Sequence, residues 1–94
     1  MIKSFEHKGL ESFFLTGSKK GIQAAHAKKL DRQLITLNSA THPQQMDLPG
    51  WHFHPLKNFR KGKDTWAVSL NGNWRLIFSF DGQDAELVDY LDYH

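Results

Sequence analysis

The hydrophobic pattern of this chain changes its period once, near residue 51, and this change constrains the fold more than any other feature. Before it, apolar residues recur every three or four positions, which is typical of helices with one buried face. After it, apolar and polar residues alternate, which is typical of strands that bury one face. Helices followed by strands predict an α+β domain, with an N-terminal helix pair on one face of a mostly antiparallel, roughly four-stranded sheet.

The first half of the chain predicts two helices. Leu10 and Phe13 lie on one apolar face of a helix over residues 6–15, and Gly17 is a natural stop for it. A longer helix is expected over residues 22–40, where the apolar stripe consists of Ala27, Leu30, Leu34 and Leu37. A basic turn over residues 18–21 joins the two helices into an αα-hairpin.

The second half predicts an antiparallel meander. Strands are expected over residues 65–70, 74–80 and 85–91, and a short or edge strand over residues 51–54. Asn71-Gly72 indicates a hairpin with a type I′ turn, in which both central residues need positive φ. Asp81-Gly82 begins a second tight turn, and residues 2–5 form either an edge strand or a lead-in.

Alternation along the strands also predicts which side chains share a face. If the tryptophans of the strands face the helices, His54 and Arg75 face the other way. The small residues Ala67 and Ser69 would share that face and leave room for a ligand. In the last strand, we expect Leu87 and Leu91 to face inward, which places Val88, Tyr90, Asp92 and His94 on the outer face with His54.

Length and composition limit the possible classes of protein. Ninety-four residues predict a single domain over residues 1–94. The chain has no cysteine, no signal peptide pattern and no apolar run long enough to cross a membrane, so we expect a cytoplasmic protein without membrane association. Residues 1–75 contain 12 basic and five acidic side chains, whereas residues 76–94 contain five acidic side chains and no basic one. The basic body suggests either a polyanionic partner or an ordinary solvated surface.

Three short motifs at strand ends or turns carry candidate chemistry: His54-Pro55-Leu56-Lys57, Asn73-Trp74-Arg75 and Asp92-Tyr93-His94. Together they supply proton donors and acceptors, cations and a carboxylate, which is the set that metal-independent ribonuclease chemistry needs. Scattered polar residues of these types also occur in many soluble domains. A metal shared by His52, His54 and His94 is disfavoured, because the sequence offers no fourth ligand at a supporting spacing. We expect neither a metal nor a cofactor.

Basic side chains in two loops are the candidates for contacts with RNA phosphates. They are Lys19, Lys20, Arg60, Lys61 and Lys63, with Asn73 as a further RNA-binding candidate. Trp51 and Phe59 lie near loops and are the candidates for stacking on bases.

These motifs, together with Met1-Ile2-Lys3-Ser4-Phe5 and His7-Lys8-Gly9-Leu10, resemble those of HigB toxins of the RelE/ParE superfamily. The resemblance runs over almost the whole chain in the same order. It implies a RelE-like fold and the toxin of a type II toxin–antitoxin system, which cleaves messenger RNA in the ribosomal A site. The implied partners are a HigA-like helix-turn-helix antitoxin, the 70S ribosome and messenger RNA, with DNA reached only through the antitoxin.

The resemblance also implies the site residues, which are His54, Lys57, Asn73, Arg75, Asp92, Tyr93 and His94. Either His54 or His94 would exchange the proton of the 2′-hydroxyl, and Arg75 and Lys57 would hold the phosphate oxygens. Asp92 would orient a histidine, and Tyr93 would stack on the nucleotide. The loop over residues 58–64 is more basic than the family pattern. Two other functions stay open: a ParE-like toxin that binds gyrase without cleaving RNA, and a non-catalytic RNA-binding regulatory protein.

Overall fold

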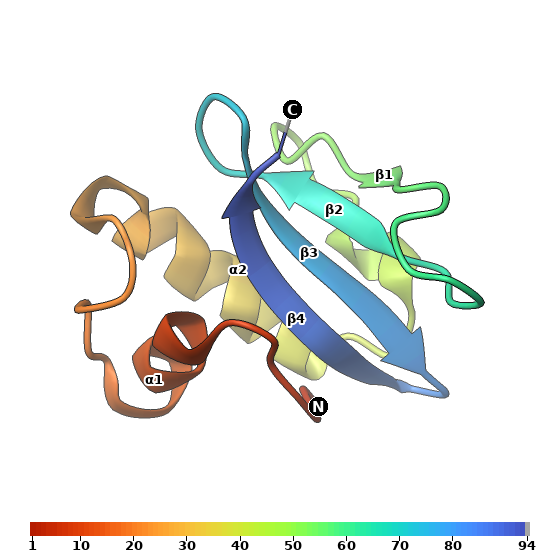
Figure 1. The fold of residues 1–94 in the computed structure, drawn as a ribbon, viewed down its shortest axis with the longest axis horizontal. Coiled ribbons are helices and arrows are strands. Elements are labelled where there is room, and N and C mark those ends of the chain that lie inside the picture. Colours follow the sequence, from red (N-terminus) through yellow and green to blue (C-terminus); the bar gives the residue numbers. More distant parts are fainter. Residues whose placement is uncertain (94) are drawn as a thin grey trace.

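The computed structural model describes residues 1–93, so the predicted site residue His94 lies outside the described residues. Helices α1 (Lys8–Thr16) and α2 (Ala27–Ser39) pack on a four-stranded antiparallel sheet of order β1-β2-β3-β4, and Figure 1 shows α2 crossing behind β3 and β4. The strands are β1 (His54–Pro55), β2 (Trp66–Ser69), β3 (Trp74–Asp81) and β4 (Asp84–Asp92). Two short 3₁₀ turns, η1 (Ala24–His26) and η2 (Pro43–Met46), complete the regular elements. The predicted α+β architecture is confirmed.

Local hydrogen bonds set the ends of α1. His7 is its N-cap residue, and the His7 Nδ1 atom accepts a hydrogen bond of 3.0 Å from the Leu10 backbone N–H. Gly17 has φ 80°, and its N–H donates to the Phe13 carbonyl oxygen at 2.9 Å. This left-handed cap ends the helix as predicted.

Helix α2 begins at Ala27, the first residue of the apolar stripe, and not at the start of the predicted range of residues 22–40. Residues 24–26 form the separate turn η1, in which the His26 N–H donates to the Gln23 carbonyl oxygen at 2.9 Å. The backbone of the preceding connection touches α1, since a Cβ atom built on Gly9 would lie 2.7 Å from the Gly21 Cα atom. Side chains at these two positions would force the segments apart, so both glycines are needed for this close approach.

Of the two predicted hairpin turns, the first differs from the prediction and the second agrees with it. In the β2–β3 connection, Gly72 has φ 59°, but Asn71 does not have positive φ, so the predicted type I′ turn is wrong. Leu70 N–H donates to the Trp74 carbonyl oxygen at 2.9 Å, which leaves three residues in the loop. The predicted tight turn after β3 is confirmed, because Asp81 pairs directly with Asp84.

A β-bulge interrupts β4 at Leu87. The register with β3 shifts by one residue there, and Leu87 has φ 55°, which is strained for a residue with a side chain. Both backbone polar groups of Leu87 bind side chains: its N–H donates to Ser4 Oγ at 2.9 Å, and its carbonyl oxygen accepts from Arg60 Nη2 at 3.0 Å. The bulge reverses the alternation, so Val88 and Tyr90 face the helices instead of the outer face. The predicted orientation of β4 is therefore wrong.

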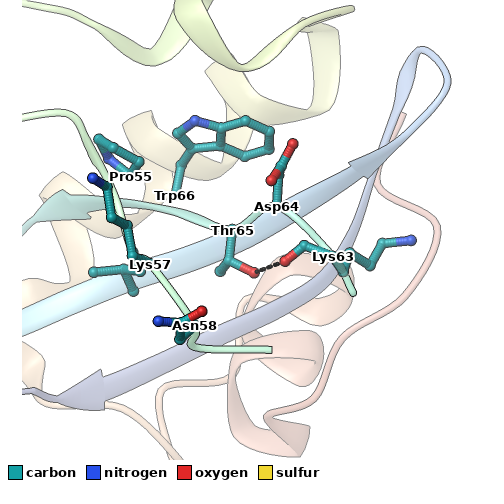
Figure 2. A pocket seen from close by; sticks show the side chains of 8 residues that line it. Pro55, Lys57, Asn58, Lys63, Asp64, Thr65 and Trp66 are labelled. Carbon is teal, nitrogen blue, oxygen red and sulfur yellow. Dashed lines mark hydrogen bonds between the residues drawn. The ribbon is translucent and has the colours of Figure 1, made fainter. Parts of the chain in front are cut away.

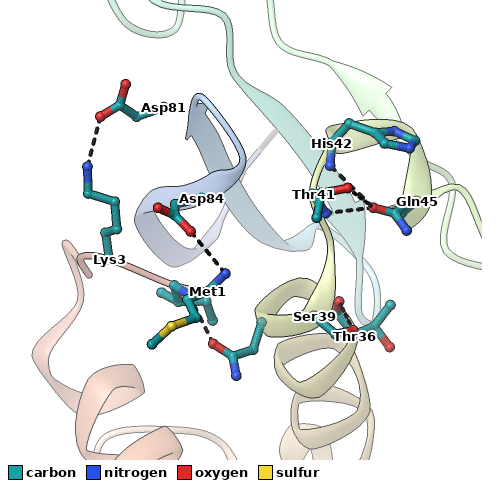
Figure 3. Close-up of polar contacts among 11 residues, drawn as sticks. Met1, Lys3, Thr36, Ser39, Thr41, His42, Gln45, Asp81 and Asp84 are labelled. Atoms are coloured by element: carbon teal, nitrogen blue, oxygen red, sulfur yellow. Dashed lines mark hydrogen bonds and ion pairs between the residues drawn. The ribbon is translucent and has the colours of Figure 1, made fainter.

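The N-terminal segment pairs with the outer edge of β4. Ile2 and Phe5 form parallel bridges to Ala85 and Val88, so this segment is an irregular edge strand. Figure 3 shows two ion pairs at the same edge, between the Met1 amine and Asp84 at 3.2 Å and between Lys3 Nζ and Asp81 at 2.8 Å. The Lys3 ammonium group lowers the pKa of Asp81 by hydrogen bonding and by charge attraction. These pairs neutralise part of the acidic C-terminal region.

A buried aromatic cluster joins α2 to the sheet. His26 is only 3% exposed, and its Nδ1 atom lies 2.6 Å from the Tyr90 hydroxyl oxygen. The Trp74 ring lies 4.7 Å from the Tyr90 ring and 5.5 Å from the His26 ring, measured between centroids. Burial lowers the pKa of His26 below 6.5, because the charged imidazolium is poorly solvated there. A neutral His26 therefore accepts the Tyr90 proton.

Replacing Ser4 tests how the bulge is held. We expect Ser4→Ala to lower the free energy of unfolding by about 1 kcal/mol, because the part-buried Leu87 N–H loses its acceptor. Urea unfolding at neutral pH measures this change. Ser12 is exposed on α1, so Ser12→Ala is the control and should change stability by less than about 0.5 kcal/mol. Equal effects of the two substitutions would contradict the assigned role.

Titration tests the burial of His26. Its pKa is 6.5 when unfolded and lower when folded, so the unfolded chain binds the extra proton first as pH falls. The stability associated with neutral His26 is present above pH 6.5 and is lost as pH falls from 6.5 towards the folded pKa. The free energy of unfolding, measured with urea, should decrease less between pH 7.5 and pH 5 in His26→Gln than in the parent protein. An equal decrease in the two proteins would contradict the burial of His26.

Candidate functional site

His54 and Arg75, two of the predicted site residues, line one cavity of about 580 Å³. Pairing of β1 with β2 and of β2 with β3 places His54, Ala67 and Arg75 on the same face of the sheet, as the alternation predicts. The remaining lining residues come from the loop before β1, the end of β2, the β2–β3 turn and α2: Lys29, Gly50, His52, Ser69, Leu70, Asn71 and Gly72.

The imidazole of His54 is held by its own loop. Its Nδ1 atom lies 2.7 Å from the His52 carbonyl oxygen, and His52 adopts φ 51°. Because a carbonyl oxygen only accepts hydrogen bonds, Nδ1 carries the proton in this contact. The Nε2 atom of the neutral ring is then the nitrogen that can take up a proton, which suits a general base.

Arg75 is held by backbone carbonyl groups at the β2–β3 turn. Its Nη1 atom donates to the carbonyl oxygens of Gly72 at 2.8 Å and Trp74 at 3.1 Å. Its Nε atom is buried, and no residue within the described range 1–93 accepts a hydrogen bond from it. The guanidinium group therefore has donor capacity left for an anion.

The part of this face beside Ala67 is closed. Ala67 and Ile77 are fully buried beneath Leu56, with Phe59 and Leu91 packed around them. Ser69 is 9% exposed. The expectation that small residues leave an open sheet face is therefore wrong, because the loop after β1 covers the sheet there. The space for a ligand lies at the end of β2 instead.

Lys57 lies in a different cavity from His54. This second cavity, of about 460 Å³, is lined by Lys57 together with Asn58, Asp64 and Trp66 (Figure 2). Lys57 is exposed and comes from the loop that follows β1. The structure thus places the two ends of the His54-Pro55-Leu56-Lys57 motif in neighbouring cavities rather than in one.

Two of the predicted phosphate contacts already have partners inside the protein. Besides binding the Leu87 carbonyl oxygen, Arg60 donates from Nη1 to Ser79 Oγ at 3.4 Å and lies over the Phe59 ring. Lys63 forms an ion pair with Glu86. Both side chains therefore fasten the basic loop to the sheet.

The other basic candidates are exposed and lie apart from the His54 cavity. Lys61 is in the loop after β1, whereas Lys19 and Lys20 are in the connection after α1. Lys19 lines a small cavity with Phe13 and Asp31 on the helical side. The structure does not bring these three lysines into one group with His54.

The end of β4 lies beside the β2–β3 turn, as Figure 1 shows. Tyr93 N–H donates to the Asn73 carbonyl oxygen at 2.8 Å, and the Tyr93 ring packs 5.8 Å from the Phe59 ring. Asp92 pairs directly with Trp74, and directly paired residues point to the same side of a sheet. Asp92 therefore projects on the helical side, and its predicted place on the Arg75 face is wrong.

Sequence reasoning missed Lys29 and misjudged Trp51. Lys29 lines the His54 cavity from α2, one position before the buried stripe residue Leu30. Trp51 is 4% exposed within the main core and has no free ring face for a base. The backbone of Trp51 is fastened to the end of β2, since Ser69 N–H donates to the Trp51 carbonyl oxygen at 2.7 Å.

The part of the chain that the structure describes has neither a metal site nor a membrane-spanning helix. Among residues 1–93, no three His, Asp or Glu side chains are grouped so that they could bind a metal ion. No helix in the same range has the length and apolar character needed to cross a membrane.

The hydrogen bond from His54 can be checked by NMR. We expect the neutral ring to be the Nδ1–H tautomer, because the His52 carbonyl oxygen accepts that proton. Long-range ¹H–¹⁵N correlation spectra at pH 8 report which ring nitrogen is protonated. A predominantly Nε2–H ring would contradict the assigned geometry, and His54→Gln identifies the signal.

The sequence matches a family model and a relative along almost its whole length. A family model described as the RelE-like toxin of type II toxin–antitoxin system HigB matches residues 3–94. The chain is 36% identical over 94 residues to the protein named Endoribonuclease HigB from Proteus vulgaris, and the alignment covers 100% of both chains. The chain therefore belongs to the HigB-like family of RelE-like toxins from type II toxin–antitoxin systems.

Proposed function

We propose that this toxin is an endoribonuclease that enters the ribosomal A site and cleaves messenger RNA there, which stops translation. The observation that carries the proposal is that His54 and Arg75 line the same cavity, although 21 positions separate them. The relative from Proteus vulgaris, named an endoribonuclease, supports the same activity. Acid–base groups beside a cation suit attack on a phosphodiester.

In the proposed reaction, His54 Nε2 takes the proton of a ribose 2′-hydroxyl group. The 2′-oxygen attacks the adjacent phosphorus, and the bond from phosphorus to the 5′-oxygen breaks. Arg75 donates hydrogen bonds to the non-bridging oxygens, where negative charge gathers. A proton from the C-terminal tail, which we assign to His94, completes the departing 5′-hydroxyl group. The products are a 2′,3′-cyclic phosphate and a 5′-hydroxyl end.

Other residues would extend this site along the RNA. We propose that Lys57, in the neighbouring cavity of Figure 2, holds a phosphate, and that Tyr93 and Asn73 contact a nucleotide beside the turn. Asp92, which projects on the helical side of the sheet, would orient a histidine of the site. The exposed Lys61, Lys19 and Lys20 would face RNA of the ribosome, whereas Arg60 and Lys63 keep the loop in place.

A type II toxin acts together with an antitoxin. We propose a HigA-like antitoxin with a helix-turn-helix domain, so that DNA is reached only through that partner. Because the substrate is bound to the 70S ribosome, we also propose that the toxin works in the cytoplasm. The proposed reaction uses neither a cofactor nor a metal.

Substitution at the cavity tests the activity. We expect His54→Ala and Arg75→Gln each to lower the cleavage rate about 10²- to 10⁴-fold, because each removes a group that acts on the transition state. Single-turnover cleavage of ribosome-bound messenger, mapped by primer extension, measures the rate. Arg32 is exposed on α2, so Arg32→Gln removes the same charge as a control and should cleave normally.

Two outcomes would contradict the proposal. One is full-rate cleavage by both cavity variants. The other is growth inhibition with intact messenger and accumulating DNA breaks, which would favour a toxin that binds gyrase. Cleavage of the same messenger without ribosomes, at an equal rate, would contradict the ribosome dependence alone.

A further inference from the structure

Lys29 enters the His54 cavity from α2, whereas the other charged side chain there, Arg75, comes from β3. Lys29 is half-buried, and its Nζ atom donates a hydrogen bond of 3.2 Å to the Leu70 carbonyl oxygen. That carbonyl is at the end of β2, beside the turn to which Arg75 also binds. Both cations therefore bind backbone carbonyl groups at the β2–β3 turn, Lys29 from α2 and Arg75 from β3.

The next turn of α2 fixes where Lys29 lies. Gln33 is fully buried, and its Nε2 atom donates to the Ser69 carbonyl oxygen at 2.9 Å. Lys29 and Gln33 are four positions apart and so lie on the same face of the helix. They bind the successive carbonyl groups of Leu70, just after β2, and Ser69, the last residue of β2. These contacts set the rotation and the height of α2 against the strand.

The charge of Lys29 is not neutralised by a carboxylate in the described part of the chain. The ion pairs found among residues 1–93 involve Met1, Lys3 and Lys63, and none involves Lys29. The Leu70 carbonyl uses one of the three ammonium donors, so two remain. A half-buried cation in this state favours an anion in the adjoining space.

The cavity lining is suited to an anion as a whole. Among residues 1–93, the lining contains the imidazoles of His52 and His54 besides Lys29 and Arg75, and it contains no Asp or Glu side chain. The buried Nε donor of Arg75 also has no acceptor within residues 1–93. Two cations that line one polar cavity suit the negatively charged backbone of a nucleic acid.

We propose that Lys29 is a phosphate-binding residue of this cavity, which holds the backbone of single-stranded RNA together with Arg75. The inference rests on the proposed function, because the cleaved RNA would supply the phosphate. The position next to it provides a matched control. Lys28 is exposed and lines a different cavity with Phe13 and Asp31, so it has the same charge on another face of α2.

Binding can be measured apart from cleavage. The probe is a fluorescein-labelled 2′-O-methyl RNA dodecamer, which has no free 2′-hydroxyl to attack, and fluorescence anisotropy gives its Kd. We expect Lys29→Gln to weaken binding about tenfold at low salt and to reduce the slope of log K against log salt by about 0.7, the value for one phosphate contact on a single strand. Lys28→Gln should leave both quantities unchanged, and Lys29→Arg should restore the slope.

A second measurement uses the unsubstituted protein. Acetylation by acetic anhydride, read residue by residue by mass spectrometry, should show that the dodecamer protects Lys29 but not Lys28. This result decides the matter if Lys29→Gln does not fold. Absence of protection, equal slopes for the two glutamine variants, or no binding by the parent protein at low salt would overturn the inference. If the parent protein binds the dodecamer but does not cleave messenger on ribosomes, this result would overturn the proposed function alone.

Discussion

The β-bulge at Leu87 is the constraint on which the rest of the sheet depends. Its positive φ costs on the order of 1–3 kcal/mol, and it persists because Ser4 and Arg60 bind both of its backbone polar groups. Through those two contacts the N-terminal segment and the basic loop are fastened to opposite sides of one residue. The bulge also turns Tyr90 towards His26, so the buried aromatic cluster and the direction of the C-terminal tail follow from it.

The sequence was sufficient for the order of the elements and for the placement of His54 and Arg75 on the same face of the sheet. Both follow from local patterns: helix caps such as Gly17, short turns, and strict alternation along β2 and β3. The orientation of Asp92 was not predictable in the same way. Leu87 has an ordinary strand side chain, and the partners that hold its unusual conformation lie 83 and 27 positions away. One extra residue in the strand then reverses every later side chain.

The ion pairs also join residues that are far apart in the sequence. The acidic C-terminal region and the basic body look separate in the sequence, but Lys3, Lys63 and the Met1 amine are paired with carboxylates of β3 and β4. A cluster of basic residues therefore does not by itself locate an RNA-binding surface. The role of Lys29 was hidden for a related reason. Its direction depends on how α2 is rotated against β2, which the buried amide of Gln33 decides.

The pairing of the N-terminal segment with β4 has a consequence for how the protein is made. Ser4 is synthesised early, but the backbone that it binds emerges 83 residues later. Contacts of such long range form late, because the intervening chain must first be closed into a loop. Until β4 has left the ribosome, neither the outer edge of the sheet nor the bulge can exist. A nascent chain whose β4 is still inside the ribosome therefore lacks the bulge that turns Tyr90 towards His26.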